Sequence, residues 1–513
     1  MFSFKFCRQS LLFCYAKAWR WAILFALTST SVFAANLLEV YQQAQLSDAE
    51  YQEAVMRRLS VNEGVPISIA ALLPNISAQF SPSITHMSYS GSGVQTDVNG
   101  NTISPKNNTQ RFYNLQLTAT QTVFNFAQFT QVAGSVSTAK AADADINAAA
   151  QQLMVRVAQA YFAILQDEDN LAYSEASKSA FKAQLDEAKQ QHEVGLKTIT
   201  DVYTAKARYD SAIANCLSMQ AVLTNDRENL RVITGKYYPH ISRLSEHFPL
   251  VSPHPAQIEI WVNKALAQNW MIKSYQYKAQ TALQNVRRQF AGHLPTLNIQ
   301  GTLQRQYSDN INGYNTYLQR NGPAVENDKQ IGLNLTVPLF AGGGVVAQTN
   351  QARYDYEASQ QQLEQVTRKV VNTARQSFLN VMAGIGKVSA DKQAVTSNIH
   401  SLQGMEESYR AGSETLFNVL NQQQILLNTQ TQYALDRYAF VNDILVLKQA
   451  AGTLSFDDLR AINVWLVEDE PAVYFKQIKV RHVAKKRVSK HSVKKQIIGK
   501  KKNITHIKLT VRS

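Results

Sequence analysis

The chain has 513 residues and a formal net charge of +14, from 52 Lys and Arg against 38 Asp and Glu. A strongly basic chain invites a nucleic-acid interpretation. The distribution of the charge argues against it, because fourteen of the basic residues lie in 474–513, which holds no acid, and four more lie in the first 34 residues. Without these eighteen, 34 basic residues face 38 acids, so the body is mildly acidic and we expect no nucleic-acid partner.

Residues 1–34 have the features of a secretory signal peptide: a basic segment, an apolar run and small residues before a cleavage position after Ala34. Cleavage would remove Cys7 and Cys14 and leave Cys216 as the only cysteine. An exported chain with one cysteine forms no intramolecular disulfide, so we expect it to be held by packing alone. Beyond the leader, no apolar run approaches the roughly twenty residues of a membrane helix.

From Arg111 to Phe124 the residues alternate between apolar and polar, the period-two pattern of a strand that is wet on one face. Similar alternation predicts two strand pairs, 75–91 with 111–124 and 296–308 with 330–340, joined by solvent-exposed loops rich in Gly, Ser and Asn. A sheet built from such strands could be either a soluble sheet packed on a core or a membrane barrel with water inside. Four strands of about ten residues favour the barrel.

Proline is absent from 106–238 and from 339–470. Glycines divide these runs into predicted helices at 127–192, 197–233, 345–410 and 414–450. Shorter helical stretches are predicted at 36–64 and 256–292. A helix of about sixty-five residues is roughly 98 Å long, so the long helices must pack along one another in a bundle with coiled-coil-like contacts.

The chain repeats itself at a shift of 216 to 221 residues. The clearest match sets Gly195–Val202 (GLKTITDV) on Gly412–Val419 (GSETLFNV). We therefore predict two internal repeats, 35–254 and 255–460, followed by a basic tail, 461–513, that we expect to be disordered. Each repeat supplies two strands, and a sheet in lipid cannot keep open edges. Several copies must share one barrel; two would give eight strands and three twelve, and the residues alone leave this choice open.

Two motifs carry a family resemblance: Val194-Gly195-Leu196 followed by Ile199–Val202, and Ile233–Pro239 (ITGKYYP). Over Asn36–Leu459 the chain resembles the TolC family of outer-membrane efflux and secretion ducts. The resemblance implies an α+β membrane fold: a homotrimer with a 12-strand β-barrel, four strands per chain, continued into a long α-helical coiled-coil periplasmic tunnel. It further implies outer-membrane lipid, a periplasmic adaptor protein and an inner-membrane RND, ABC or MFS transporter as partners.

The resemblance also assigns site residues near two helix-to-helix turns. A periplasmic aperture is implied at Gln190, Thr200, Asp201, Tyr409, Glu414, Asn418 and Asn421. Adaptor contacts are implied at the tips Gly195, Leu196, Gly412 and Ser413. Gln190 and Tyr409 keep a polar pair of the family.

Three aperture positions depart from the family pattern. Glu414 stands where the family has arginine, and Asn418 and Asn421 stand where it has two ring aspartates, so a cation-selective ring is not expected. Our hypothesis is that Lys197 or Arg410 meets Glu414 instead. On residue grounds alone, Asp201 is better explained as a helix N-terminal charge than as a gate residue.

No residue pattern predicts catalysis, a metal site or a cofactor. The Gly342–Gly344 run lacks the Lys and hydroxyl of a phosphate loop and is interpreted as a strand-to-helix hinge, and Asp457-Asp458 as a solvated turn. We expect a passive exit duct of a tripartite efflux pump or type I secretion system, not an enzyme. The alternative is a periplasm-spanning structural coiled coil or an adaptor without channel activity, which would not need the four amphipathic strands.

Overall fold

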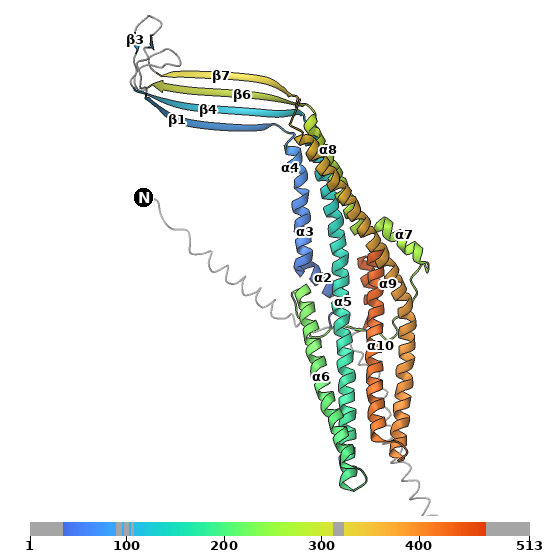
Figure 1. Cartoon of the computed structure of the whole chain (residues 1–513). Helices are drawn as coiled ribbons and strands as arrows, with labels where there is room; N and C mark the ends of the chain where they lie inside the picture. The colour runs from blue at the N-terminus through green and yellow to red at the C-terminus, as the bar shows by residue number, and fades with distance from the viewer. Residues whose placement is uncertain (1–33, 89–94, 97–101, 104–106, 311–322, 468–513) are drawn as a thin grey trace, which may run out of the picture.

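The computed structural model describes residues 34–88, 95–96, 102–103, 107–310 and 323–467. The predicted signal peptide up to residue 33, parts of two strand-connecting loops and the basic tail beyond 467 lie outside the described residues. A four-stranded sheet occupies one end of the molecule, and long helices run from it to the far end (Figure 1).

The main sheet has the strand order β1-β4-β6-β7, and each neighbouring pair is antiparallel. Its strands are β1 (Asn75–Ser88), β4 (Asn107–Phe124), β6 (Thr296–Asn310) and β7 (Ala324–Thr336), and two short strands, β2 (Gln95–Thr96) and β3 (Thr102–Ile103), pair separately. The register places Ala78, Leu117 and Leu303 in one row. Residues in one row point to one face, so the apolar side chains of successive strands share a face.

The last strand differs from its prediction, because β7 ends at Thr336 and begins at Ala324 rather than at residue 330. Pro338 has no N–H to donate to a ladder, which fits an end before it. The early part, Glu326–Lys329, pairs with β6 although its charged side chains hide the alternation. Part of the predicted loop is therefore strand.

The helices pack along one another beneath the sheet (Figure 1). Their bounds are α2 (Leu37–Ser47), α3 (Ala49–Asn62), α4 (Gly64–Ala70), α5 (Phe126–Glu193), α6 (Ile199–Thr234), α7 (Ile258–Gln268), α8 (Trp270–Phe290), the 3-10 turn η1 (Ala291–His293), α9 (Gly344–Arg410), α10 (Leu416–Ala450) and α11 (Phe456–Asn463). At the end away from the sheet, α5 folds back as α6 and α9 folds back as α10. Helices α2, α3, α4 and α6 all pack along α5.

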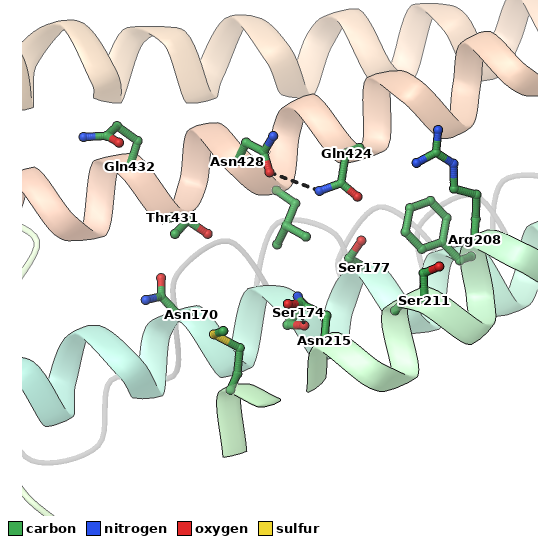
Figure 2. A pocket seen from close by; sticks show the side chains of 14 residues that line it. Asn170, Ser174, Ser177, Arg208, Ser211, Asn215, Gln424, Asn428, Thr431 and Gln432 are labelled. Atoms are coloured by element: carbon green, nitrogen blue, oxygen red, sulfur yellow. Dashed lines mark hydrogen bonds between the residues drawn. The ribbon is translucent and has the colours of Figure 1, made fainter. Parts of the chain in front are cut away.

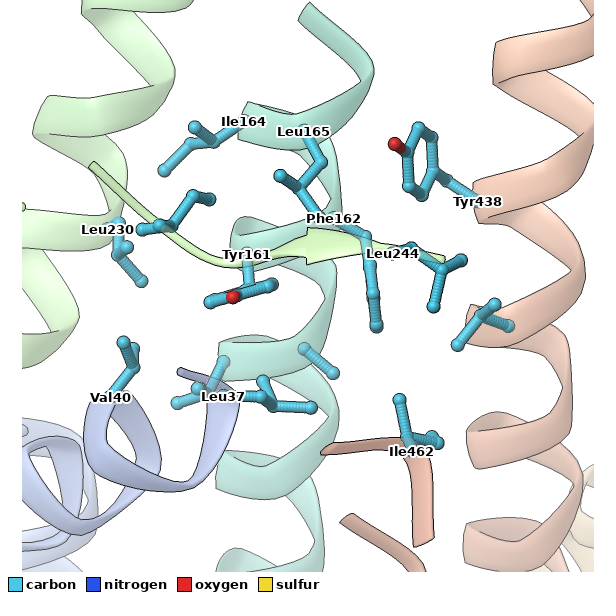
Figure 3. Packing of buried hydrophobic residues seen from close by; sticks show 14 of the residues in the cluster. Leu37, Val40, Tyr161, Phe162, Ile164, Leu165, Leu230, Leu244, Tyr438 and Ile462 are labelled. Atoms are coloured by element: carbon cyan, nitrogen blue, oxygen red, sulfur yellow. The ribbon is translucent and has the colours of Figure 1, made fainter. Parts of the chain in front are cut away.

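The largest cluster of buried apolar side chains among the described residues surrounds the middle of α5 (Figure 3). Tyr161 and Phe162 are fully buried there, against apolar side chains of α2, α6, α10 and α11. The Tyr161 hydroxyl lies within hydrogen-bonding distance of the carbonyl oxygens of Ser242 (2.7 Å) and Ala35 (3.2 Å). This contact ties α5 to the segment that joins the two halves of the chain.

The segment around residue 460 also differs from prediction. Asp457 and Asp458 belong to the first turn of α11, where Ser455 and Asp458 form a capping box and Lys448 pairs with Asp458. A capping box satisfies two backbone donors that a helix start leaves free. Strand β8 (Leu466–Val467) then pairs with β5 (Arg243–Leu244), so the folded body extends past the predicted boundary at 460. Among the described residues, no helix combines the length and apolarity that crossing a membrane requires.

Gly452 supports a stability prediction. Its φ is +71°, and a Cβ built there would lie 2.6 Å from the carbonyl carbon and oxygen of Gln268. Gly452→Ala should destabilise the chain by roughly 3 kcal/mol, since a left-handed non-glycine residue alone costs about 1–3 kcal/mol. The thermal unfolding midpoint in detergent measures the effect. Gly386→Ala is the matched control, because its Cβ meets nothing within 4 Å; equal midpoints for the two variants would contradict the prediction.

Candidate functional site: the tips of the two helical hairpins

The turn from α5 to α6 and the turn from α9 to α10 have the same backbone geometry. In the first, Gly195 has φ +77° and the Leu196 N–H donates to the Gln191 carbonyl at 2.8 Å. In the second, Gly412 has φ +83° and Ser413 closes the equivalent bond at 3.0 Å. This is a Schellman motif, in which a residue without Cβ takes the left-handed position. Both glycines are therefore required by the turns themselves.

The helices that follow the turns begin with threonine caps. Thr198 Oγ1 accepts from the Asp201 N–H at 3.3 Å, and the Asp201 carboxylate accepts from the Thr198 N–H at 3.2 Å. Thr415 Oγ1 accepts from the Asn418 N–H at 3.3 Å, but the Asn418 side chain instead donates to the Glu414 carboxylate at 2.8 Å. Within its own chain, Asp201 completes a capping box, and Glu414 is held by a neutral neighbour.

Tyr409, near the end of α9, connects the two hairpins. Its hydroxyl donates to Gln191 Oε1 at 3.3 Å, and Lys197 Nζ lies 4.5 Å from the centre of its ring. Burial raises the pKa of the Tyr409 hydroxyl, and the carboxylates of Glu187 and Asp201 raise it further. The phenol is therefore neutral and available as a donor at physiological pH.

Not every expected aperture residue takes part in this contact. Gln190 is exposed, and its neighbour Gln191 is the partner of Tyr409 within the chain. Lys197, expected to meet Glu414, lies over the Tyr409 ring. Our sequence analysis did not identify Gln191. The helical repeat could have indicated it, because Gln191 lies one turn after Ala188 on the same face of α5, and Ala188 is buried. Thr200, Asn418 and Asn421 are exposed.

Buried apolar side chains join the hairpins above the tips. They come from all four long helices: Phe181, Leu185, Ala188, Val202, Ala205, Ala212, Leu402, Tyr409, Leu416, Val419, Leu420 and Leu426. At the turns the pattern reverses, because Val194 is 69 % exposed and Leu196 is 73 % exposed. Apolar side chains that stand in solvent at one tip are typical of a contact surface.

Above the tips, a groove of about 550 Å³ lies between α5, α6 and α10 (Figure 2). Its polar lining is neutral, for example Ser174, Ser177 and Asn428, apart from Arg208. Gln424 donates to Asn428 at 3.0 Å across one turn of α10. No group of three or more His, Cys, Asp or Glu that could hold a metal ion occurs in the part of the chain that the structure describes.

A sheet with one apolar face, continued into long helical hairpins with closed turns, is the fold of known outer-membrane channel proteins. The chain belongs to the outer membrane efflux protein family, whose model matches residues 40–236 and 261–453. It is 34 % identical to the outer membrane protein TolC of Salmonella enteritidis over 445 residues, 86 % of this chain and 87 % of that protein. It is 26 % identical to the alkaline protease secretion protein AprF of Pseudomonas aeruginosa over 460 residues, 88 % of this chain and 92 % of that protein.

Solved structures agree on the fold. The match to the Campylobacter jejuni CmeC outer membrane channel has a TM-score of 0.69 at 17 % sequence identity. It covers 84 % of this chain and 89 % of the CmeC chain. The match to the outer membrane protein VceC of Vibrio cholerae has a TM-score of 0.67 at 19 % sequence identity. It covers 81 % of this chain and 96 % of the VceC chain. The chain is an outer-membrane protein of this channel class.

The threonine caps lead to a prediction about the tips. Thr198→Ala removes the side-chain acceptor of the α6 cap, which is worth about 1 kcal/mol, so the first amides of α6 should exchange with solvent roughly fivefold faster. Hydrogen exchange followed by mass spectrometry measures this. Thr204→Ala is the control, because Thr204 donates only to the Thr200 carbonyl within the helix. Unchanged exchange at residues 199–202 in Thr198→Ala would show that the cap does not hold the turn.

Proposed function

We propose that this chain forms the exit duct of a tripartite efflux pump or type I secretion system. It conducts small toxic molecules or secreted proteins passively from an inner-membrane translocase to the exterior. The observation that carries the proposal is the exposed apolar face of the sheet, where Ile331 is 87 % exposed and Ile84 70 % exposed. A face of this kind on a well-paired sheet suits hydrocarbon, whereas in water it would associate non-specifically.

The assembly proposed is a homotrimer with a 12-strand barrel. Among the described strands, β1 and β7 each have a partner strand on one side only. Lipid tails provide no hydrogen-bond partners for the N–H and C=O groups of the free edges. Eight strands would leave an interior filled by side chains. The inner row Ser77, Thr118, Thr302 and Gln330 is small or polar, which suits the water-filled lumen of three copies.

The proposed origin of the chain is a duplication of one half, with repeats at 35–254 and from 255 to about 460. Each half contributes two neighbouring strands and one long helical hairpin. The shared turn geometry at Gly195 and Gly412 supports the equivalence. The threonine caps at Thr198 and Thr415 follow at the same spacing and support it further.

The partners proposed are a periplasmic adaptor at the tips and an inner-membrane RND, ABC or MFS transporter beneath it. The exposed side chains of Val194 and Leu196 offer an apolar contact at the α5–α6 turn. The groove lined by neutral polar side chains and Arg208 lies further up the same hairpins. Gly195, Leu196, Gly412 and Ser413 are the tip residues we assign to this contact.

The aperture is proposed where three copies of the tips meet. Gln190, Thr200, Asp201, Tyr409, Glu414, Asn418 and Asn421 would lie there, as in the family pattern. Because Asn418 and Asn421 carry no charge, the ring they form would not concentrate cations. The Tyr409 contacts with Gln191 and Lys197 would hold each pair of hairpins together while the aperture is closed.

The direct test of the function is reconstitution of the full-length protein in a planar lipid bilayer. Discrete conductance steps are expected from a duct. A structural coiled coil or an adaptor would give none, and a silent membrane containing correctly folded trimer would contradict the proposal. Export of a fluorescent efflux substrate, restored in a strain that lacks its own exit duct, separates a conducting pore from a leak.

The neutral ring yields a further prediction. The double variant Asn418→Asp/Asn421→Asp should favour potassium over chloride more strongly than the wild-type channel does, because carboxylates added at a narrow mouth attract cations. Reversal potentials under a salt gradient measure the permeability ratio. Asn229→Asp is the control, since Asn229 lies near the opposite end of α6 from the tip. A ratio that moves equally in the control, or not at all in the double variant, would remove these residues from the aperture.

A further inference from the structure

The groove between α5, α6 and α10 lies between two separate clusters of buried apolar side chains. One cluster surrounds Tyr161 and Phe162, and the other joins the hairpins above the tips. Between the two clusters, polar side chains from all three helices face a cavity of about 550 Å³ (Figure 2). Cavities of roughly 300–1,000 Å³ hold small molecules in proteins. The groove therefore has the size of a small-molecule site.

The lining of the groove limits the charge of what it can hold. It consists of Asn, Gln, Ser and Thr side chains, a few apolar side chains such as Phe181 and Leu427, and one charged residue, Arg208 of α6. No acid is among the lining residues. A lining with one positive charge suits a ligand with one negative charge, because a second negative charge would have no cation beside it.

Several polar groups of the lining are already paired within the chain. Ser174 Oγ accepts from Asn215 Nδ2 at 2.9 Å, which joins α5 to α6. Gln424 donates to Asn428 at 3.0 Å along α10. These side chains have hydrogen bonds without any ligand, so they shape the groove and are not its main binding groups.

Three other groups of the lining lack such partners. Asn170 is 7 % exposed and Ser177 is 2 % exposed, and both side chains of α5 point into the groove (Figure 2). Asn170 Oδ1 and Ser177 Oγ have no hydrogen-bond partner among the described residues. Arg208 forms no ion pair or hydrogen bond with another described residue. Since a buried polar atom without a partner costs free energy, a bound molecule that supplies one is favoured.

The positions of these three groups define the chemistry of that molecule. Asn170 and Ser177 are seven residues apart on α5, about 10 Å along the helix axis, and Arg208 lies at the Ser177 end of the groove (Figure 2). A carboxylate matches the guanidinium group with two parallel hydrogen bonds. Asn170 Oδ1 accepts hydrogen bonds, so the group beside it must be a hydroxyl or an N–H. The apolar side chains of Phe181 and Leu427 can contact the carbon skeleton in between.

We propose that the groove binds a small monocarboxylate that also carries hydroxyl or amide groups. Its carboxylate pairs with Arg208, and its hydroxyl or N–H groups bond to Asn170 and Ser177. The groove is built by α5 and α6 of the first hairpin and by α10 of the second, so the ligand bridges both hairpins. A ligand that binds only when the hairpins are packed together stabilises that arrangement. This site lies apart from the tips and does not depend on the proposed export function.

The test uses D-gluconate, which has one carboxylate and a chain of hydroxyl groups. Isothermal titration calorimetry of the full-length protein in detergent should give a dissociation constant of about 1 mM, the order expected for a ligand of this size. Sorbitol has the hydroxyl groups without the charge, and acetate has the charge without the hydroxyl groups. Each should bind at least about tenfold more weakly. Hydrogen exchange followed by mass spectrometry should show protection by gluconate at 170–181 and 424–432.

Two variants test the named groups. Arg208→Gln should raise the dissociation constant of gluconate about tenfold or more, because it removes the charged hydrogen bonds. Ser177→Ala should raise it about threefold or more without lowering the unfolding midpoint, because the Ser177 hydroxyl bonds to no described residue. Lys206→Gln is the matched control: it removes the same charge from α6, but Lys206 is exposed and does not line the groove.

Three results would each overturn the proposal. The first is no binding of gluconate to the wild-type protein at concentrations up to roughly 50 mM, fifty times the expected dissociation constant. The second is equal affinity for gluconate and sorbitol, which would remove the carboxylate from the recognition. The third is equal affinity in Arg208→Gln and Lys206→Gln. Because binding is measured in detergent, a failure to conduct in a bilayer would contradict the exit duct and leave this result unchanged.

Discussion

A strand edge in hydrocarbon leaves a row of N–H and C=O groups without partners, at several kcal/mol for each group. The four-stranded sheet has two such edges, on β1 and on β7. Its apolar face also stands in solvent in the single chain. The sheet is therefore incomplete by itself, and the proposed trimer follows from this requirement rather than from any single side chain. In that trimer the helices would be arranged around one axis, because those that meet the sheet continue its strands through short connections, such as Asn125 between β4 and α5.

The helical part balances rigidity against movement. Around Tyr161 and Phe162 the packing is dense and apolar, and it fixes α5 against α2, α10 and α11. One to two turns further along α5, Asp167, Glu168 and Asp169 replace apolar packing with charge. At the tips, hydrogen bonds and a single cation–π contact at Tyr409 take over. A second cluster of buried apolar side chains, which includes Leu185 of α5 and Leu420 of α10, still joins the hairpins above the tips, so the change to polar contacts is confined to the turns themselves.

The sequence predicted those features that depend on local periodicity. Alternation along β4 and the absence of proline over α5 and α9 each reflect one backbone geometry repeated many times. The helix-to-helix turns at Gly195 and Gly412 were equally predictable, because few residues other than glycine tolerate the left-handed conformation. The start of β7 was not, since charges at Glu326–Lys329 break the alternation while the backbone still pairs with β6.

Contacts across helices were beyond the sequence for a physical reason. Whether Gln190 or Gln191 faces Tyr409 depends on the rotation of one helix by about 100°, which weak amphipathic patterning does not fix. Glu168 and Arg227 lie 59 positions apart and meet at 2.9 Å only because α6 folds back along α5 in one register. The acid run QDEDN suggests a solvated face when read locally. Only the packing shows that Asp167 and Asp169 are buried.

The most direct measurement is disulfide mapping between the free edges of the sheet. In a Cys216→Ser background, one cysteine replaces Ser77 on β1, and a second is moved along β7 from Gln330 to Thr336. Three chains sharing one closed barrel predict that at least one register gives oxidised species on denaturing gels that end at three linked chains. Failure to cross-link in every register, or a series that ends at two chains, would contradict the shared barrel on which this account depends.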